Sequence, residues 1–212
     1  MVIAIDGPAG AGKSTVARGV ADALGFTYLD SGAMYRCVAL AALEVGTDPD
    51  DAGAVGALAR ELEVELDGTR VSLAGRDVSE SIRSPEVSDA AARVSVHPEV
   101  REALVERQRG LIEAGRYVAE GRDIGTVVSP EAPLKIYLTA SADERARRRA
   151  ADTGEPEAHV LTAQDQRDAS DREREHGALR IAADAIEIDT TGLATETVIA
   201  RIVDLARQRE LG

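Results

Sequence analysis

The sequence predicts an α/β protein with a parallel sheet, for three reasons. Short continuous apolar runs alternate with amphipathic helical patterns along most of the 212 residues, as expected where helices cover both faces of a sheet. The first apolar run ends in a glycine-rich loop that leads directly into a helix. One segment in the first half changes to a two-residue period, which indicates an antiparallel insertion.

The runs and patterns define the expected elements in chain order. Five apolar runs predict strands at Val2–Ile5, Phe26–Leu29, Tyr117–Ala119, Leu134–Leu138 and Ala185–Ile188. Six segments with helical periodicity predict helices at Ser14–Leu24, Ala33–Val45, Pro98–Ala114, Ala142–Ala151, Ala163–His176 and Thr195–Arg209. Together these elements predict one core built from residues 1–46 and 97–212.

The segment from Leu62 to Val78 follows a different pattern. Apolar residues alternate with three glutamates up to an Asp67-Gly68 pair, and the alternation resumes after it. Alternation around an Asp-Gly turn is typical of a hairpin with one solvated face. We therefore expect residues 47–96 to form an insertion that shapes a substrate site.

Composition excludes several classes of protein. The formal net charge of -13 disfavours a phosphate-backbone partner, and the 2% aromatic content leaves no stacking platform for bases. The single Cys37 excludes a disulfide framework. The apolar run Val2–Ile5 is too short for a signal peptide, and no stretch approaches the roughly 20 apolar residues of a membrane span. We expect a cytoplasmic protein without nucleic-acid or membrane partners.

The glycine-rich loop carries the most specific signal. It matches G-x-x-x-x-G-K-[ST] after a buried strand and before a helix, which is the context that a P-loop requires. In such a loop the backbone N–H groups and the helix N-terminus bind phosphates, the lysine reaches the β- and γ-phosphates, and the Ser14 hydroxyl binds Mg²⁺. The expected ATP-binding residues are Gly7, Pro8, Ala9, Gly10, Ala11, Gly12, Lys13, Ser14 and Thr15.

The P-loop leaves the function open between a phosphate-transferring enzyme and a nucleotide-sensing module. Lys135 is followed by Ile136 and Tyr137, so the N/T-K-x-D motif with which GTPases read guanine is missing. A second anionic pocket would favour the enzyme, and two further motifs point to one. Asp30 with Arg36 and Arg122 with Asp123 follow other predicted strands, so they are expected at the ligand-binding edge of the sheet.

Two arginine groups near the C-terminus indicate a lid. Arg145, Arg148 and Arg149 share one helix face and Arg147 points away from it. Arg167, Asp171 and Arg174 form a second stripe. The breaker-rich turn at residues 152–156 separates the two helices, so we expect a lid at about residues 150–160 that closes over transferring phosphates.

At this point the chain resembles the bacterial cytidylate kinases over nearly its whole length. The resemblance rests on the motifs IDGPAGAGKST, LDSGAMYR, GRDVSESIR, VREAL, EGRDIGTVV and RDASDRER. It implies a nucleoside monophosphate kinase fold, namely a P-loop kinase core with a parallel sheet flanked by helices, an antiparallel hairpin insertion for monophosphate binding and a short helical lid. It also implies transfer of the ATP γ-phosphoryl group to CMP or dCMP, giving CDP or dCDP, with Mg²⁺.

The resemblance also implies roles for individual residues. The CMP contacts fall on Ser31, Arg36, Arg101, Arg122, Asp123, Arg167, Asp171 and Arg174. Among them, Arg36 and Arg122 hold the acceptor phosphate, Arg101 and Asp123 address cytosine, and Arg167 and Asp171 address the ribose. Independently of the resemblance, bringing two polyanions together requires positive charge at the transferring group, and we expect this charge from the catalytic set Lys13, Arg122, Arg149 and Arg174. We expect a monomer.

The sequence departs from the family pattern at three places. Ala92 stands where the family has a serine, which bears on the discrimination between CMP and UMP. Ser95 lies three residues further on, a spacing that would place it on the same face of a helix. The motif EGRD replaces DGRD, and Ala178-Leu179 replaces proline-leucine; we expect both to affect packing. Kinases with UMP, AMP or shikimate as acceptor, and a nucleotide-sensing module, remain the alternatives.

Overall fold

The computed structural model describes residues 1–113 and 115–210, and packing divides the chain into two compact units. The first, called the core unit here, comprises Met1–Tyr28 and Gly115–Gly212. The second, the inserted unit, comprises Leu29–Ala114.

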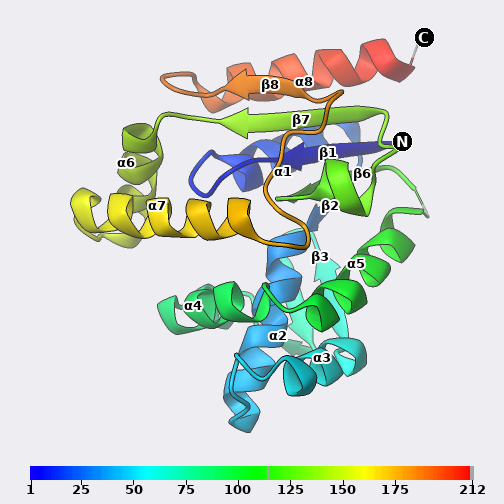
Figure 1. Ribbon diagram of the computed structural model, residues 1–212. Helices are drawn as coiled ribbons and strands as arrows, with labels where there is room; N and C mark the ends of the chain where they lie inside the picture. Colours follow the sequence, from blue (N-terminus) through cyan, green and yellow to red (C-terminus); the bar gives the residue numbers. More distant parts are fainter. Residues whose placement is uncertain (114, 211–212) are drawn as a thin grey trace. The chain divides into compact units, whose positions relative to one another are not determined.

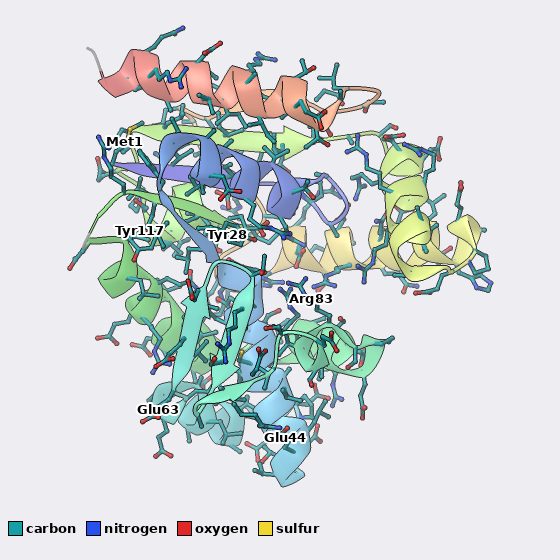
Figure 2. All side chains as sticks on the ribbon, turned by 180° about the vertical axis from the view of Figure 1, so that it is seen from behind. Met1, Tyr28, Glu44, Glu63, Arg83 and Tyr117 are labelled. Carbon is teal, nitrogen blue, oxygen red and sulfur yellow. The ribbon has the colours of Figure 1, made fainter. Side chains whose placement is uncertain are left out.

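The core unit is built on a sheet with the order β2-β6-β1-β7-β8 (Figure 1). The strands are β1 (Val2–Asp6), β2 (Thr27–Asp30), β6 (Tyr117–Gly121), β7 (Leu134–Thr139) and β8 (Ile186–Asp189). β1 pairs in parallel with β6 and β7, and β7 pairs in parallel with β8. Figure 2 shows Met1 and Tyr117 at the same end of the sheet, where the Tyr117 N–H donates to the Met1 carbonyl over 3.1 Å. The five predicted strands and their parallel arrangement are confirmed.

Helices α1 (Lys13–Leu24) and α8 (Thr195–Glu210) pack together against the sheet. Their apolar residues share a buried cluster with β1, β6, β7 and β8, including Ile5, Val20, Leu138 and Ile202. Helices α6 (Ala142–Thr153) and α7 (Glu157–Glu173) pair with each other beyond the carboxyl end of β7 (Figure 1). The core helices thus follow the order that the sequence predicts.

Two local details of the core unit differ from the prediction. Helix α7 begins at Glu157, six residues before the expected start, because Gly154 ends α6 in a left-handed conformation and Pro156 precedes a new helix at once. It ends at Glu173, because the chain then turns back and the Leu179 N–H donates to the Asp171 carbonyl. The second difference is a π-helical turn, η2 (Ile124–Val128), directly after Asp123.

The inserted unit holds four helices and a small sheet. The helices are α2 (Ser31–Val45), α3 (Ala52–Glu61), α4 (Pro85–Val94) and α5 (Pro98–Glu113), with a 3-10 turn η1 (Ser81–Arg83). Strands β3 (Val64–Asp67) and β4 (Arg70–Leu73) form the predicted hairpin around Gly68. Strand β5 (Arg76–Asp77) adds a third antiparallel strand, which the sequence analysis missed, as it missed α3 and α4.

The inserted unit is wider than the predicted insertion over residues 47–96. Helix α2 packs against α3, α4 and α5, and α3 packs against α5. Packing therefore assigns α2 and α5 to the same unit as the hairpin, whereas the sequence alone placed both helices in the core. Ala114, the expected last residue of the α5 helix, lies outside the described residues.

Candidate active site

The P-loop connects β1 to α1, and its backbone conformation explains why glycine stands at two of its positions. Gly7 has φ 151°, and a Cβ there would lie 2.1 Å from the carbonyl oxygen of Leu138 on β7. Gly12 has φ 86° and caps α1 without any side-chain hydrogen bond, so the helix N-terminus offers its backbone donors to an anion. A Cβ at Gly12 would meet nothing closer than 3.7 Å, which leaves room next to this helix end.

Lys13 is buried at the start of α1. Its Nζ donates a hydrogen bond to the carbonyl oxygen of Pro8 over 2.7 Å. Burial, followed by the positive charge of Arg122, lowers the pKa of Lys13 from 10.5 to about 7, although Glu120 and Asp6 oppose the shift. Binding of an anion such as a phosphate next to this lysine would stabilise its charged form. A lysine with such a lowered pKa in a phosphate loop is therefore typical of an anion-binding site.

The other side of the P-loop is held by the helices predicted to form the lid. Arg145 on α6 donates to the Ala9 carbonyl over 2.9 Å and pairs with the buried Asp168 on α7 at 2.7 Å. Gln164 on α7 in turn donates to the Arg145 carbonyl over 3.2 Å. Neither Asp168 nor this role of Arg145 was predicted, because the contact between Arg145 and Ala9 spans 136 residues.

The remaining arginines of α6 differ in what they contact. Arg148 bonds Glu144 and the Thr190 carbonyl, each at 2.8 Å. Arg147 is exposed and also bonds Glu144. Arg149 is exposed as well. Two of the four α6 arginines, Arg145 and Arg148, therefore bond backbone carbonyls outside α6. The other two are exposed.

A buried charge cluster joins the end of β6 to α7. The Nε of Arg122 donates to Asp171 over 2.8 Å, and Arg174, the residue after α7, bonds the other oxygen of Asp171. Burial alone would raise the pKa of Asp171, but the charges of Arg122 and Arg174 hold it below its ordinary value. Three predicted site residues thus meet. The charge of Arg167, which is exposed on α7, also lowers the pKa of Asp171.

The loop after β6 is fixed by Asp6, the last residue of β1. Its two carboxylate oxygens accept hydrogen bonds from the N–H groups of Ile124 at 2.8 Å and Gly125 at 2.7 Å. Burial, offset by these bonds, raises the pKa of Asp6 to about 6. Asp123, a predicted cytosine contact, is buried in the same loop. Glu120, the departure from the family motif, accepts a hydrogen bond from Tyr28.

Within the inserted unit, Asp30 organises the start of α2. Its carboxylate caps the helix through the Ala33 N–H at 2.8 Å and pairs with Arg36 at 2.8 Å. Ser31 is buried at the first position of the helix. A guanidinium held by one carboxylate next to a helix N-terminus is suited to an anionic group.

Arg101 on α5 is buried and lies over the ring of Tyr35 at 5.6 Å. It also donates to the carbonyl of Ser95 over 3.4 Å. The Ser95 hydroxyl donates to the carbonyl of Ala92 over 2.9 Å, so its proton is used within the end of α4. Tyr35 was not predicted, because an aromatic residue on a helix reads first as a core residue.

The residues at the P-loop fit Mg²⁺ held together with a triphosphate. Ser14, the second residue of α1, is partly exposed beside the open helix end. Among residues 1–113 and 115–210, no group of three His, Cys, Asp or Glu side chains could hold a metal ion. Mg²⁺ commonly takes one or two protein oxygens and completes its shell with phosphates and water, and Ser14 meets that requirement.

A parallel sheet with a P-loop between its first strand and first helix defines a P-loop kinase fold. The fold resembles that of a gluconokinase from Sinorhizobium meliloti 1021, with a TM-score of 0.53 at 15% identity, covering 99% of this chain and 93% of that chain. Residues 3–208 match the family model described as cytidylate kinase. The chain belongs to the cytidylate kinase family.

Two curated relatives support this membership. A cytidylate kinase of Mycobacterium leprae (strain Br4923) is 48% identical over 215 residues, covering 99% of this chain and 96% of the relative. A cytidylate kinase of Carboxydothermus hydrogenoformans is 49% identical over 214 residues, covering 97% and 96%. The similarity thus extends over the core unit and the inserted unit alike.

Proposed function

We propose that this chain transfers the γ-phosphoryl group of ATP to CMP or dCMP, giving CDP or dCDP, with Mg²⁺ at the P-loop. Membership of the cytidylate kinase family supports a phosphotransferase of this kind. The observation that carries the assignment is the charge cluster of the core unit. In the register of β1 and β6, Asp6 before the P-loop lies opposite Gly121 before Arg122. The P-loop and Arg122, which bonds Asp171, therefore follow neighbouring strand ends.

The donor side is formed by the P-loop. Backbone N–H groups within Gly7–Thr15, other than Pro8, which has none, would hold the ATP phosphates, with Lys13 at the β- and γ-phosphates. Ser14 would hold Mg²⁺, which supplies charge neutralisation to the transferring group. Since Arg145 bonds the Ala9 carbonyl, the lid helices would help to keep the loop in its phosphate-binding shape.

The acceptor side uses arginine rather than a general base. The second pKa of a phosphate monoester is about 6, so the acceptor oxygen is already ionised at neutral pH. Catalysis then consists of positioning and charge stabilisation. Arg122 and Arg36 would hold the acceptor phosphate, and Arg149 and Arg174 would act on the transferring group.

The proposal also gives individual residues roles in recognising the nucleoside. Asp123 accepts from the exocyclic amino group of cytosine, where uracil has a carbonyl, and Arg101 addresses the base edge. Asp171 and Arg167 address the ribose, and Ser31 completes the CMP contacts. The Ser95 hydroxyl donates its proton to the Ala92 carbonyl, so Ser95 can replace the missing serine only as a hydrogen-bond acceptor. We therefore expect measurable activity on UMP.

The proposal extends to the location and assembly of the protein. In the part of the chain that the structure describes, no helix combines the length and apolar character needed to cross a membrane. We propose a cytoplasmic, monomeric enzyme, since a net charge as far from zero as -13 favours a dissolved, unassociated chain.

A substrate panel tests the proposal. ADP release is measured with Mg-ATP and each of CMP, dCMP, UMP, AMP, GMP and shikimate, and without acceptor. Preference for CMP or dCMP supports the assignment. Preference for UMP would overturn the role of Asp123 and leave the phosphate chemistry standing, whereas ATP binding without turnover on any acceptor would favour a nucleotide sensor.

A further inference from the structure

We propose that Asp6 is a positioning residue for the acceptor nucleotide, although it directly precedes the donor loop. The inference rests on the proposed function, because it takes Arg122 and Asp123 as acceptor contacts. Asp6 would act through backbone hydrogen bonds that hold the loop carrying these two residues.

The first argument is the geometry of the loop. Residues Ile124–Val128 form a π-helical turn, closed by hydrogen bonds from Val128 N–H to Asp123 O and from Ser129 N–H to Ile124 O. The first N–H groups of a helical turn have no partner within it. Here the turn has no side-chain cap from Asp123, and Asp6 accepts from the first two N–H groups instead.

The second argument is the register of the sheet. Asp6 on β1 lies opposite Gly121 on β6, so these two strands end side by side at the same edge of the sheet. One leads into the P-loop, and the other leads into Arg122, Asp123 and the π turn. A carboxylate at the end of β1 is therefore placed to fix the position of the acceptor loop relative to the donor loop.

The third argument is the choice of residue. Asp6 is 5% exposed, and burial of an ionised carboxylate is costly unless its oxygens are satisfied. The Ile124 and Gly125 N–H groups bond different oxygens of Asp6, and only a carboxylate offers an acceptor at both positions, since an amide would present an NH₂ group at one of them. A buried acid kept at such a cost beside an active site indicates a functional role.

The test compares the two substrates in one variant. Asp6→Asn keeps the shape but presents an NH₂ group to one of the two N–H donors. We expect KM for CMP to rise at least about tenfold, because small displacements of binding groups are costly, while KM for ATP changes less than about threefold. Asp189→Asn is the matched control, since Asp189 also ends a strand and accepts two hydrogen bonds from Thr191, but is exposed.

A second variant disturbs the same contact from the loop. A Cβ at Gly125 would lie 3.3 Å from Asp6 Oδ2 and 3.2 Å from Lys135 Cδ, so Gly125→Ala should also raise KM for CMP, by a smaller factor. It tests the inference even where Asp6→Asn does not fold.

The outcomes separate this inference from the proposed function. Equal rises in KM for ATP and CMP, or an unchanged KM for CMP in both variants, would overturn it. Arg122→Ala is measured alongside. If Arg122→Ala raises KM for CMP and the Asp6 and Gly125 variants do not, only the inference fails; if Arg122→Ala also has no effect, the acceptor assignment fails and the inference falls with it.

Discussion

The ammonium nitrogen of Lys13 lies 2.7 Å from the carbonyl oxygen of Pro8 and donates a hydrogen bond to it. An ammonium group has three N–H donors, so one bond to the loop leaves two for the phosphates. This hydrogen bond fixes the Lys13 side chain across the P-loop in the absence of a ligand.

Replacing Lys13 by alanine should abolish transfer and preserve the fold. Loss of a preorganised cation at the transferring group should lower kcat by about 10³-fold or more. The unfolding midpoint should not fall. Burial lowers the pKa of Lys13, which means that the charged side chain is less stable in the folded protein than in water, so its removal costs no folding free energy. The check is kcat with CMP together with the unfolding midpoint, and near-normal turnover would contradict the P-loop assignment.

Binding of Mg-ATP should take up protons at slightly alkaline pH. The pKa of Lys13 lies at about 7 in the free protein, because of burial and Arg122. A triphosphate favours the charged form and raises this pKa, so a lysine that is partly neutral above pH 7 becomes protonated on binding. Apparent affinity for ATP should therefore fall as the pH rises above 7.

Calorimetry in buffers of different ionisation enthalpy measures this uptake. We expect a clear buffer dependence at pH 8, a much smaller one at pH 6, where Lys13 is already charged, and none from this group in Lys13→Ala. A buffer-independent heat at pH 8 in the unmodified protein would show that Lys13 stays charged throughout.

The local pattern of the sequence was sufficient for the sheet and the core helices, since each buried strand is a continuous apolar run bounded by a turn. It was insufficient for α3 and α4, two ten-residue helices on either side of the hairpin, because the two-residue alternation between them drew attention away from their helical patterns. Their start signals were nevertheless present: Asp51 caps α3, and Ser84 caps α4 with Pro85 at its first position.

The candidate site shows the same limit at longer range. The P-loop is contiguous, so its motif could be read directly. By contrast, Asp6 finds its partners 118 and 119 residues away, and Arg145 reaches Ala9 over 136 residues. Spacing along α6 predicted one face for Arg145, Arg148 and Arg149. It could not show that Arg145 and Arg148 bond the backbone carbonyls of Ala9 and Thr190 while Arg149 is exposed.

Arg149 should matter for turnover where its neighbour Arg147 does not. Both are exposed on α6, and Arg147 bonds Glu144 on its own helix. If Arg149 acts on the transferring phosphoryl group, Arg149→Ala should lower kcat by about 10³-fold. Arg147→Ala is the matched control, and it should leave kcat within about twofold because it removes only a surface ion pair. Similar kcat values in the two variants would remove Arg149 from the catalytic set.

Loss of the Asp171 carboxylate should weaken CMP binding more than ATP binding. Asp171 holds Arg122 through a 2.8 Å bond and also pairs with Arg174. In Asp171→Ala both guanidinium groups lose this partner, so Arg122 no longer has a fixed position from which to bind an acceptor phosphate. The P-loop backbone that would hold ATP makes no hydrogen bond to Asp171 among the described contacts.

The same substitution should also lower stability, by about 3–5 kcal/mol, because it breaks a buried ion pair from one side. Binding must therefore be compared below the unfolding transition, with CMP and ATP titrated separately. Asp165→Ala, an exposed change on the same helix, should alter neither affinity. Asp171→Asn retains one acceptor oxygen and can keep one of the arginines in place. Its affinity for CMP should therefore lie between those of Asp171→Ala and Asp165→Ala. Equal losses of CMP and ATP affinity in Asp171→Ala would instead indicate that Asp171 supports only the packing of α7.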